Sequence, residues 1–147
     1  MLFEYDDLTK EGIAIADFSD LVRIIRETSS TEITDTDAWH NFIDWHNAAA
    51  IRTFKKTIGK DNYNKILLDT DDDYIADMKR VEMFFTIREM KLAQITYQDD
   101  GYQTSSVEGT TLSVPEQQRI IQRLYNRAMF IVRQYWSIDG GEVYRIA

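Results

Sequence analysis

The chain has 147 residues, the length of one ordinary domain, with no room for a second of normal size. Its 25 acidic residues outnumber the 17 basic ones, and a net charge of −8 argues against tight, non-specific DNA binding, which needs clustered lysine and arginine. The absence of cysteine excludes disulfide scaffolds, cysteine metal sites and thiol catalysis.

The N-terminal region contains the first predicted helix. Residues 1–30 lack a basic start followed by an apolar run, and the first seven are acidic overall, so we expect no signal peptide. No stretch approaches the roughly 20 apolar residues of a membrane span, so we expect no membrane contact. A short helix is predicted after capping residues at 17–19 and ends in the Ser/Thr cluster at 28–31.

The second predicted helix starts after the capping residues at 34–37 and ends at Gly59. Its apolar stripe has helical spacing and consists of Trp39, Phe42, Ile43, His46, Ala50, Phe54 and Ile58. A brief helical piece is expected at 62–68. The preferred interpretation of the aromatic side chains is core packing, and the alternative is that some of them anchor subunit contacts.

The third predicted helix follows the acidic run at 69–73 and continues to residue 97. Its stripe consists of Tyr74, Met78, Val81, Phe85, Leu92 and Ile95. Phe84 and Ile87 widen this stripe, so we expect the helix to be central and buried on more than one side. The acidic run lacks the glycine and the final glutamate of a calcium loop, so helix capping is the preferred interpretation.

The fourth predicted helix starts at a Ser-x-x-Glu capping box at 113–116 and is about 33 Å long. Its apolar seam consists of Ile121, Leu124, Tyr125, Ala128, Ile131, Val132 and Tyr135. Arginines lie opposite this seam, namely Arg119, Arg123, Arg127 and Arg133. They form either a solvated helix face or a surface that pairs with an acidic partner.

Two other segments are predicted contact elements. The loop at 98–112 is long for a compact helical domain, and we expect contacts from Ser105, Ser106, Val107, Glu108 and Gly109. After the turn at 139–141 the sequence alternates like a strand, which has no partner of its own except residues 137–139 across the turn. We expect this tail to bind a partner protein through Gly141, Glu142, Val143, Tyr144, Arg145 and Ile146.

These patterns predict an all-α fold. Residues 1–136 form a small helical bundle of three long helices plus a short N-terminal helix, and residues 137–147 form an extended C-terminal arm. His40, Asp44 and His46 are the one histidine-containing cluster, but the spacing of His46 does not suit a shared metal site. No phosphate loop or nucleophile motif is present. We therefore expect no catalytic residue, no metal and no cofactor.

Three stretches give the chain a family resemblance: the helix from Met78 to Leu92, the Ser/Gly-rich segment 105–113, and the second helix with Ala128 in its seam. Over residues 72–136 this pattern resembles the head–tail adaptor (connector) proteins of tailed bacteriophages. The resemblance implies a virion protein, assembled in the bacterial cytoplasm, that forms a ring of usually twelve copies under the portal protein. It also implies an arm that binds the portal, a tail or stopper protein below, and a channel that DNA passes without specific binding.

Two alternatives stay open. The first is a cytoplasmic helical interaction or regulatory module of a bacterium or phage, such as an antitoxin-like protein, which would share the acidity and the aromatic content. The second is a metal-dependent helical enzyme that uses His40, Asp44 and carboxylates of the third helix. A discrete monomer or dimer would favour the first, and a metal signal lost on changing His40 to Ala would favour the second.

Overall fold

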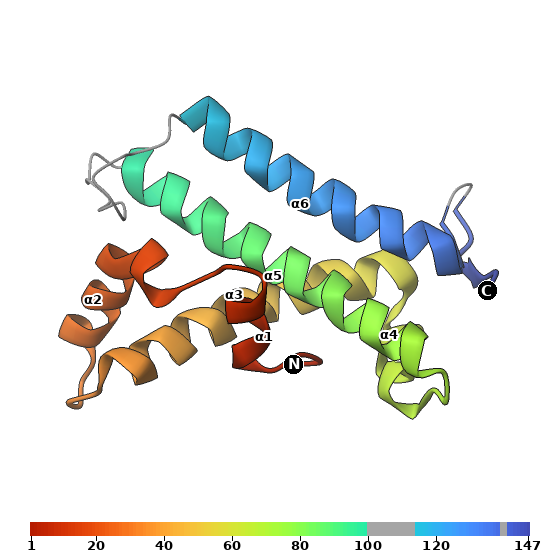
Figure 1. The fold of residues 1–147 in the computed structure, drawn as a ribbon, viewed down its shortest axis with the longest axis horizontal. Coiled ribbons are helices and arrows are strands. Elements are labelled where there is room, and N and C mark those ends of the chain that lie inside the picture. Colours follow the sequence, from red (N-terminus) through yellow and green to blue (C-terminus); the bar gives the residue numbers. More distant parts are fainter. Residues whose placement is uncertain (100–113, 139–140) are drawn as a thin grey trace.

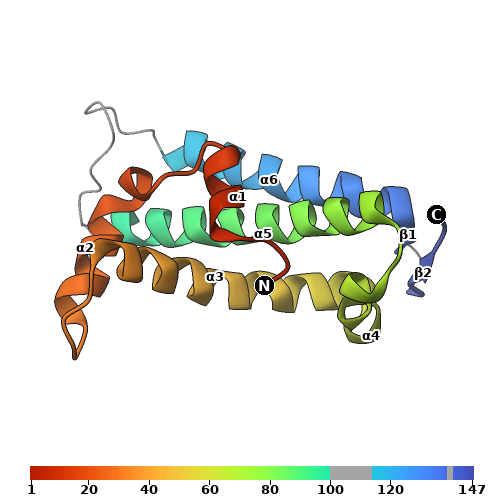
Figure 2. The same ribbon diagram turned by 60° about the horizontal axis from the view of Figure 1, so that its bottom comes forward.

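Three long helices build the fold. The computed structural model of the chain describes residues 1–99, 114–138 and 141–147. Helices α3 (Asp35–Ile58), α5 (Asp72–Asp99) and α6 (Val114–Tyr135) form a bundle in which α5 lies between the other two and contacts both (Figures 1 and 2). The predicted all-α bundle of three long helices is confirmed. No helix in the described residues is both long and apolar enough to cross a bilayer.

Short helices fill the N-terminal region and the connection between α3 and α5. They are α1 (Tyr5–Lys10), the 3₁₀ turn η1 (Ile15–Phe18), α2 (Ser19–Thr28), α4 (Lys60–Asn64) and the 3₁₀ turn η2 (Ile66–Leu68). The predicted short N-terminal helix is α2, and α1 precedes it as a further helix that was not predicted. The signal for α1 was present: the Glu4 amide donates to the Asp7 carboxylate over 2.8 Å, and Leu8 is buried.

Helix α3 has the predicted ends. The Thr34 hydroxyl accepts a 3.0 Å hydrogen bond from the Asp37 amide, and Gly59 ends the helix with a φ of 93°. The predicted stripe needs one correction. Asn47 is buried where His46 was expected, and the His46 ring lies half-buried beside Phe42, with centroids 4.7 Å apart. Burial lowers the pKa of His46.

Helix α5 is central, as predicted. Every side chain from residue 81 to residue 87 is buried, because α3 covers one side and α6 another. Phe85 lies 5.9 Å from Phe54 of α3 and 6.1 Å from Tyr125 of α6, measured between ring centroids. Two of the buried residues, Glu82 and Thr86, are polar, which the apolar pattern did not predict.

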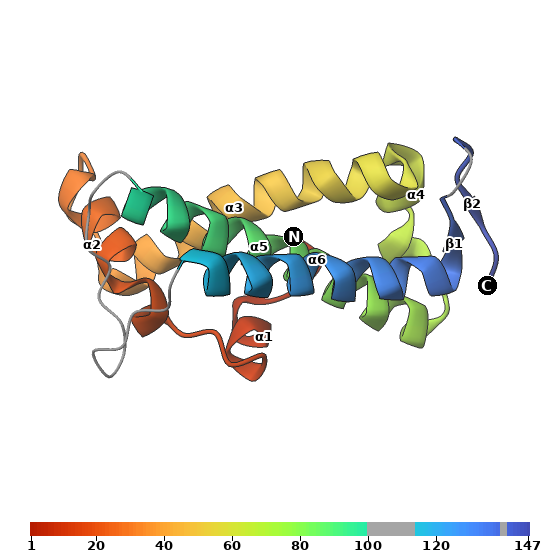
Figure 3. The same ribbon diagram turned by 90° about the horizontal axis from the view of Figure 1, so that it is seen from above.

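The C-terminal arm pairs with its own chain. Strand β1 (Trp136–Ser137) leaves the end of α6 and pairs antiparallel with β2 (Tyr144–Arg145), in the register Trp136↔Arg145 (Figure 3). The Ile146 amide donates to the Tyr135 carbonyl over 2.8 Å. Of the two possibilities for this strand, pairing across the turn is the one observed, because Ser137 pairs with Tyr144. The pairing starts one residue earlier than expected, since α6 ends at Tyr135 and Trp136 joins the strand. The segment remains exposed throughout residues 141–147.

Candidate functional site

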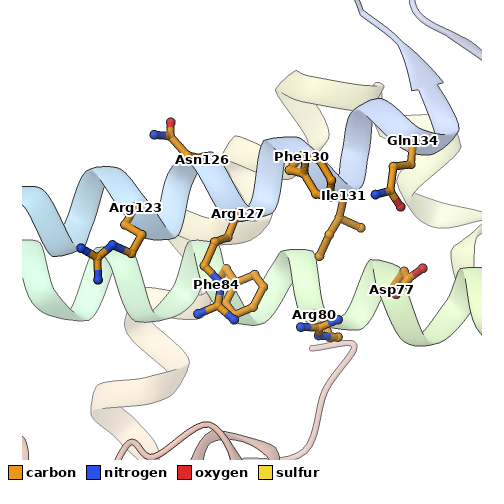
Figure 4. Close-up of a pocket in the computed structure, with 9 residues that line it drawn as sticks. All are labelled: Asp77, Arg80, Phe84, Arg123, Asn126, Arg127, Phe130, Ile131 and Gln134. Atoms are coloured by element: carbon orange, nitrogen blue, oxygen red, sulfur yellow. The ribbon is translucent and has the colours of Figure 1, made fainter.

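A groove of about 400 Å³ runs between α5 and α6 on the face shown in Figure 4. Side chains on α5 at spacings of three and four residues form one wall, and a stripe of α6 beside its buried seam forms the other. The lining residues are Asp77, Arg80 and Phe84 from α5 and Arg123, Asn126, Arg127, Phe130, Ile131 and Gln134 from α6. The groove therefore depends on both long helices and on their mutual register.

Arginines surround the aromatic floor of the groove. The Phe84 ring is buried, and the guanidinium of Arg127 lies 4.3 Å and that of Arg80 5.6 Å from its centroid. Such cation–π contacts orient a guanidinium without cancelling its charge. Within the described part of the chain, no carboxylate lies within 4.0 Å of the guanidinium nitrogens of Arg80, Arg123 or Arg127. The groove thus presents three positive charges on a chain whose net charge is −8.

At one end of the groove Asp77 is hydrogen-bonded, and the rim carries an exposed aromatic ring. The Tyr135 hydroxyl donates a 2.5 Å hydrogen bond to the carboxylate of Asp77, and this bond raises the pKa of Tyr135 to about 12. Asp77 is thus already engaged by a hydrogen bond. Phe130 stands on the rim with 68% of its surface exposed. Arginine beside an exposed aromatic ring is the composition that concentrates binding energy in protein interfaces.

The predicted contact residues divide into three groups. Arg123 and Arg127 line the groove, whereas Arg119, also exposed, does not. The loop residues at 105–109 lie outside the described residues. The predicted arm residues Glu142, Val143, Tyr144 and Ile146 are exposed at the far end of α6. Arg80 and Phe84 were not predicted, because their place in the groove depends on how α5 and α6 pack.

The arm is fixed to the bundle through Arg145. Its guanidinium lies 2.6 Å from the Asp69 carboxylate and 3.8 Å from the centroid of the Tyr74 ring. The hydrogen bond from Arg145 lowers the pKa of Asp69. Together with Val143 and Tyr144, these residues line a second hollow of about 270 Å³. These contacts within one chain hold the arm against the bundle when no partner is bound.

Changing Arg145 to Gln should loosen the arm without unfolding the bundle. The ion pair and the ring contact disappear, and two residue pairs of ladder remain to hold β2. We expect the Ile146 amide to exchange with solvent several-fold faster, measured by hydrogen exchange. The matched control is Glu142→Gln, an exposed residue of the same arm. Unchanged exchange in the Arg145 variant would mean that the backbone ladder alone fixes the arm.

The histidine cluster is engaged with α1. The His40 ring stacks on Tyr5 with centroids 3.9 Å apart, and the Tyr5 hydroxyl donates a 2.8 Å hydrogen bond to Asp44. Burial and this hydrogen bond raise the pKa of Tyr5 to about 12. Among the described residues, no group of three His, Cys, Asp or Glu side chains is placed to hold a metal ion. His40 and Asp44 thus attach α1 to α3.

A buried polar network surrounds Glu82, and no sequence pattern predicted it. The Glu82 side chain is fully buried and accepts hydrogen bonds from the Leu2 amide over 2.7 Å, from Asn47 over 3.2 Å and from the Tyr63 hydroxyl. Burial and the bond to Glu82 raise the pKa of Tyr63. Because three segments converge on one carboxylate, the network ties the N-terminus and α4 to the centre of the bundle.

No known protein family, no curated protein and no solved structure matches the chain. Its function is therefore inferred from the geometry described above.

Proposed function

We propose that the chain is a non-catalytic assembly subunit that binds other protein subunits through the groove between α5 and α6 and through its C-terminal arm. The observation that carries this proposal is the set of three groove arginines, which have no carboxylate partner among the described residues and lie beside the exposed ring of Phe130. A surface of this kind suits an acidic protein partner, because unneutralised guanidinium groups bind carboxylates strongly and directionally.

The assembly we propose is the neck ring of a tailed phage, with the chain as a connector subunit under the portal protein. The resemblance of residues 72–136 to head–tail adaptors supports this choice. The exposed arm supports it as well, since Val143, Tyr144 and Ile146 offer apolar surface to a partner. The acidic chain suits a channel wall along which DNA slides without being bound. Its other neighbours in this proposal are further copies of itself and a tail or stopper protein.

The test is the mass of the purified chain, alone and mixed with portal complexes of tailed phages. We expect a ring-sized species or a complex with the portal, measured by light scattering. Deleting residues 140–147 should abolish portal binding, because it removes β2 and its exposed apolar side chains. A stable monomer that ignores portals with its arm intact would contradict the neck-ring proposal and favour a regulatory module.

A further inference from the structure

A turn beside the C-terminal arm carries both acidic and apolar side chains. Residues 67–73, here called the leucine–aspartate turn, join η2 to α5. Leu67 and Leu68 are 57% and 79% exposed, which is unusual for two adjacent leucines in a helical bundle. Four of the five residues that follow are aspartates, namely Asp69, Asp71, Asp72 and Asp73.

Two of these aspartates are available to a partner. Asp69 is paired with Arg145, and the Asp71 carboxylate accepts hydrogen bonds from the amides of Asp73 and Tyr74, where it caps α5. Asp72 and Asp73 are exposed, and neither side chain forms a hydrogen bond or an ion pair with a described residue. The turn therefore presents two free carboxylates beside two exposed leucines.

This surface is complementary to the groove. The two free carboxylates of the turn can form ion pairs with Arg123 and Arg127. One of the exposed leucines of the turn can cover the exposed ring of Phe130. Two other acidic surfaces fit less well. The carboxylates of α1 have no large exposed apolar neighbour on that helix, and Asp44 beside the exposed Trp45 is already bonded to Tyr5.

The turn of one chain lies beyond the Asp77 end of its own groove, away from the groove arginines. Asp73 precedes Phe84, on whose ring Arg127 packs, by eleven residues, which is roughly 16 Å along the axis of α5. A contact between turn and groove therefore needs two chains. Each chain carries both a turn and a groove, so repeated contacts produce either a two-fold dimer or a head-to-tail ring.

We propose that the groove binds the leucine–aspartate turn of a second copy of this chain. This inference rests on the proposed function, and it names the partner of the groove. A stable interface buries roughly 800 Å² of each partner, about a tenth of the 8804 Å² surface of this chain. The turn and the groove form the centre of that interface, with Asp72 and Asp73 facing Arg123 and Arg127.

Charge reversal with mixing tests the contact. The groove variant carries Arg123→Glu and Arg127→Glu, and the turn variant carries Asp72→Lys and Asp73→Lys. Each alone brings like charges together, so we expect self-association on the order of 100-fold weaker than that of the wild type, measured by sedimentation velocity. An equimolar mixture pairs the acidic groove of one variant with the basic turn of the other, and association should return.

Matched controls separate this contact from general charge effects. Arg119→Glu with Arg133→Glu changes two exposed arginines of α6 outside the groove, and Asp6→Lys with Glu11→Lys changes two exposed carboxylates at α1. Both control pairs should associate like the wild type. Thermal melting of every variant verifies that it is folded.

Leu68→Ala should weaken association with no change of charge.

The outcomes distinguish this inference from the neck-ring proposal. Restored association that stops at a dimer supports the contact and contradicts the ring. Rings whose mass is unaffected by both charge reversals overturn the contact and leave the ring proposal standing. A wild-type chain that stays monomeric, a mixture that fails to associate, or a groove that binds duplex DNA instead of a second copy also overturns the contact.

Discussion

Replacing Glu82 with Ala should lower the free energy of unfolding by about 3–5 kcal/mol. The carboxylate is fully buried and is the shared acceptor for Tyr63, Asn47 and the Leu2 amide. Its removal leaves these donors without their acceptor in the protein interior and opens a cavity beside them. Urea denaturation followed by circular dichroism measures the loss. A loss below about 1 kcal/mol would show that water or a rearranged side chain replaces the carboxylate.

Tyr63→Phe tests whether the network acts as a unit. This change removes one donor and keeps the ring, so we expect a smaller loss of about 1–3 kcal/mol. The Tyr63→Phe change should cost less in the Glu82→Ala background than in the wild type, because the partner of the hydroxyl is already absent. Glu27→Ala on the exposed face of α2 is the matched control and should stay within about 0.5 kcal/mol.

Alkaline unfolding gives an independent view of the same hydroxyl. The pKa of Tyr63 is raised above its ordinary value of 10.0 in the folded chain, so the unfolded state releases this proton first as the pH rises. The resulting stabilisation is fully present below pH 10 and is lost progressively above it. The Tyr63→Phe variant should therefore lose stability less steeply above pH 10 than the wild type does.

The helices could be predicted because their burial follows from position along the chain. Apolar side chains three and four residues apart must face the same way on a helix, which placed α3, α5 and α6 close to their observed ends. The same reasoning failed at Glu82. An acidic residue within a wide apolar stripe is assigned to solvent by pattern, whereas α5 is covered at this level on every side. Its donors come from 80, 35 and 19 residues away, which no local pattern reveals.

The candidate site was predicted in part for the same reason. Arg123 and Arg127 could be placed on one face of α6 from spacing alone. Arg80 and Phe84 belong to the groove only because α5 and α6 pack in one particular register. The arm shows the reverse case. Its strand pattern was recognised and Ser137 was among its possible partners, but Trp136 was assigned to the end of a helix, so its place in the hairpin was not expected.

Two phenylalanines separate the stability of the bundle from its association. Phe85 is fully buried where the three long helices meet, between Phe54 and Tyr125. Phe85→Ala should lower the free energy of unfolding by about 3–5 kcal/mol, because the lost ring leaves a cavity that rigid helices on both sides cannot fill. Urea denaturation measures the effect, and a loss under about 1 kcal/mol would mean that the helices close the cavity.

Phe130→Ala is the matched change, the same substitution on a ring that is 68% exposed on the groove rim. Its effect on the free energy of unfolding should stay within about 0.5 kcal/mol, because little packing is lost. Its effect on self-association should be large, since the ring is the apolar part of the proposed contact with a second copy. Equal destabilisation by both changes would place Phe130 in the folding core. A Phe130 variant that associates like the wild type would remove the rim from the interface and leave the arginines alone to account for it.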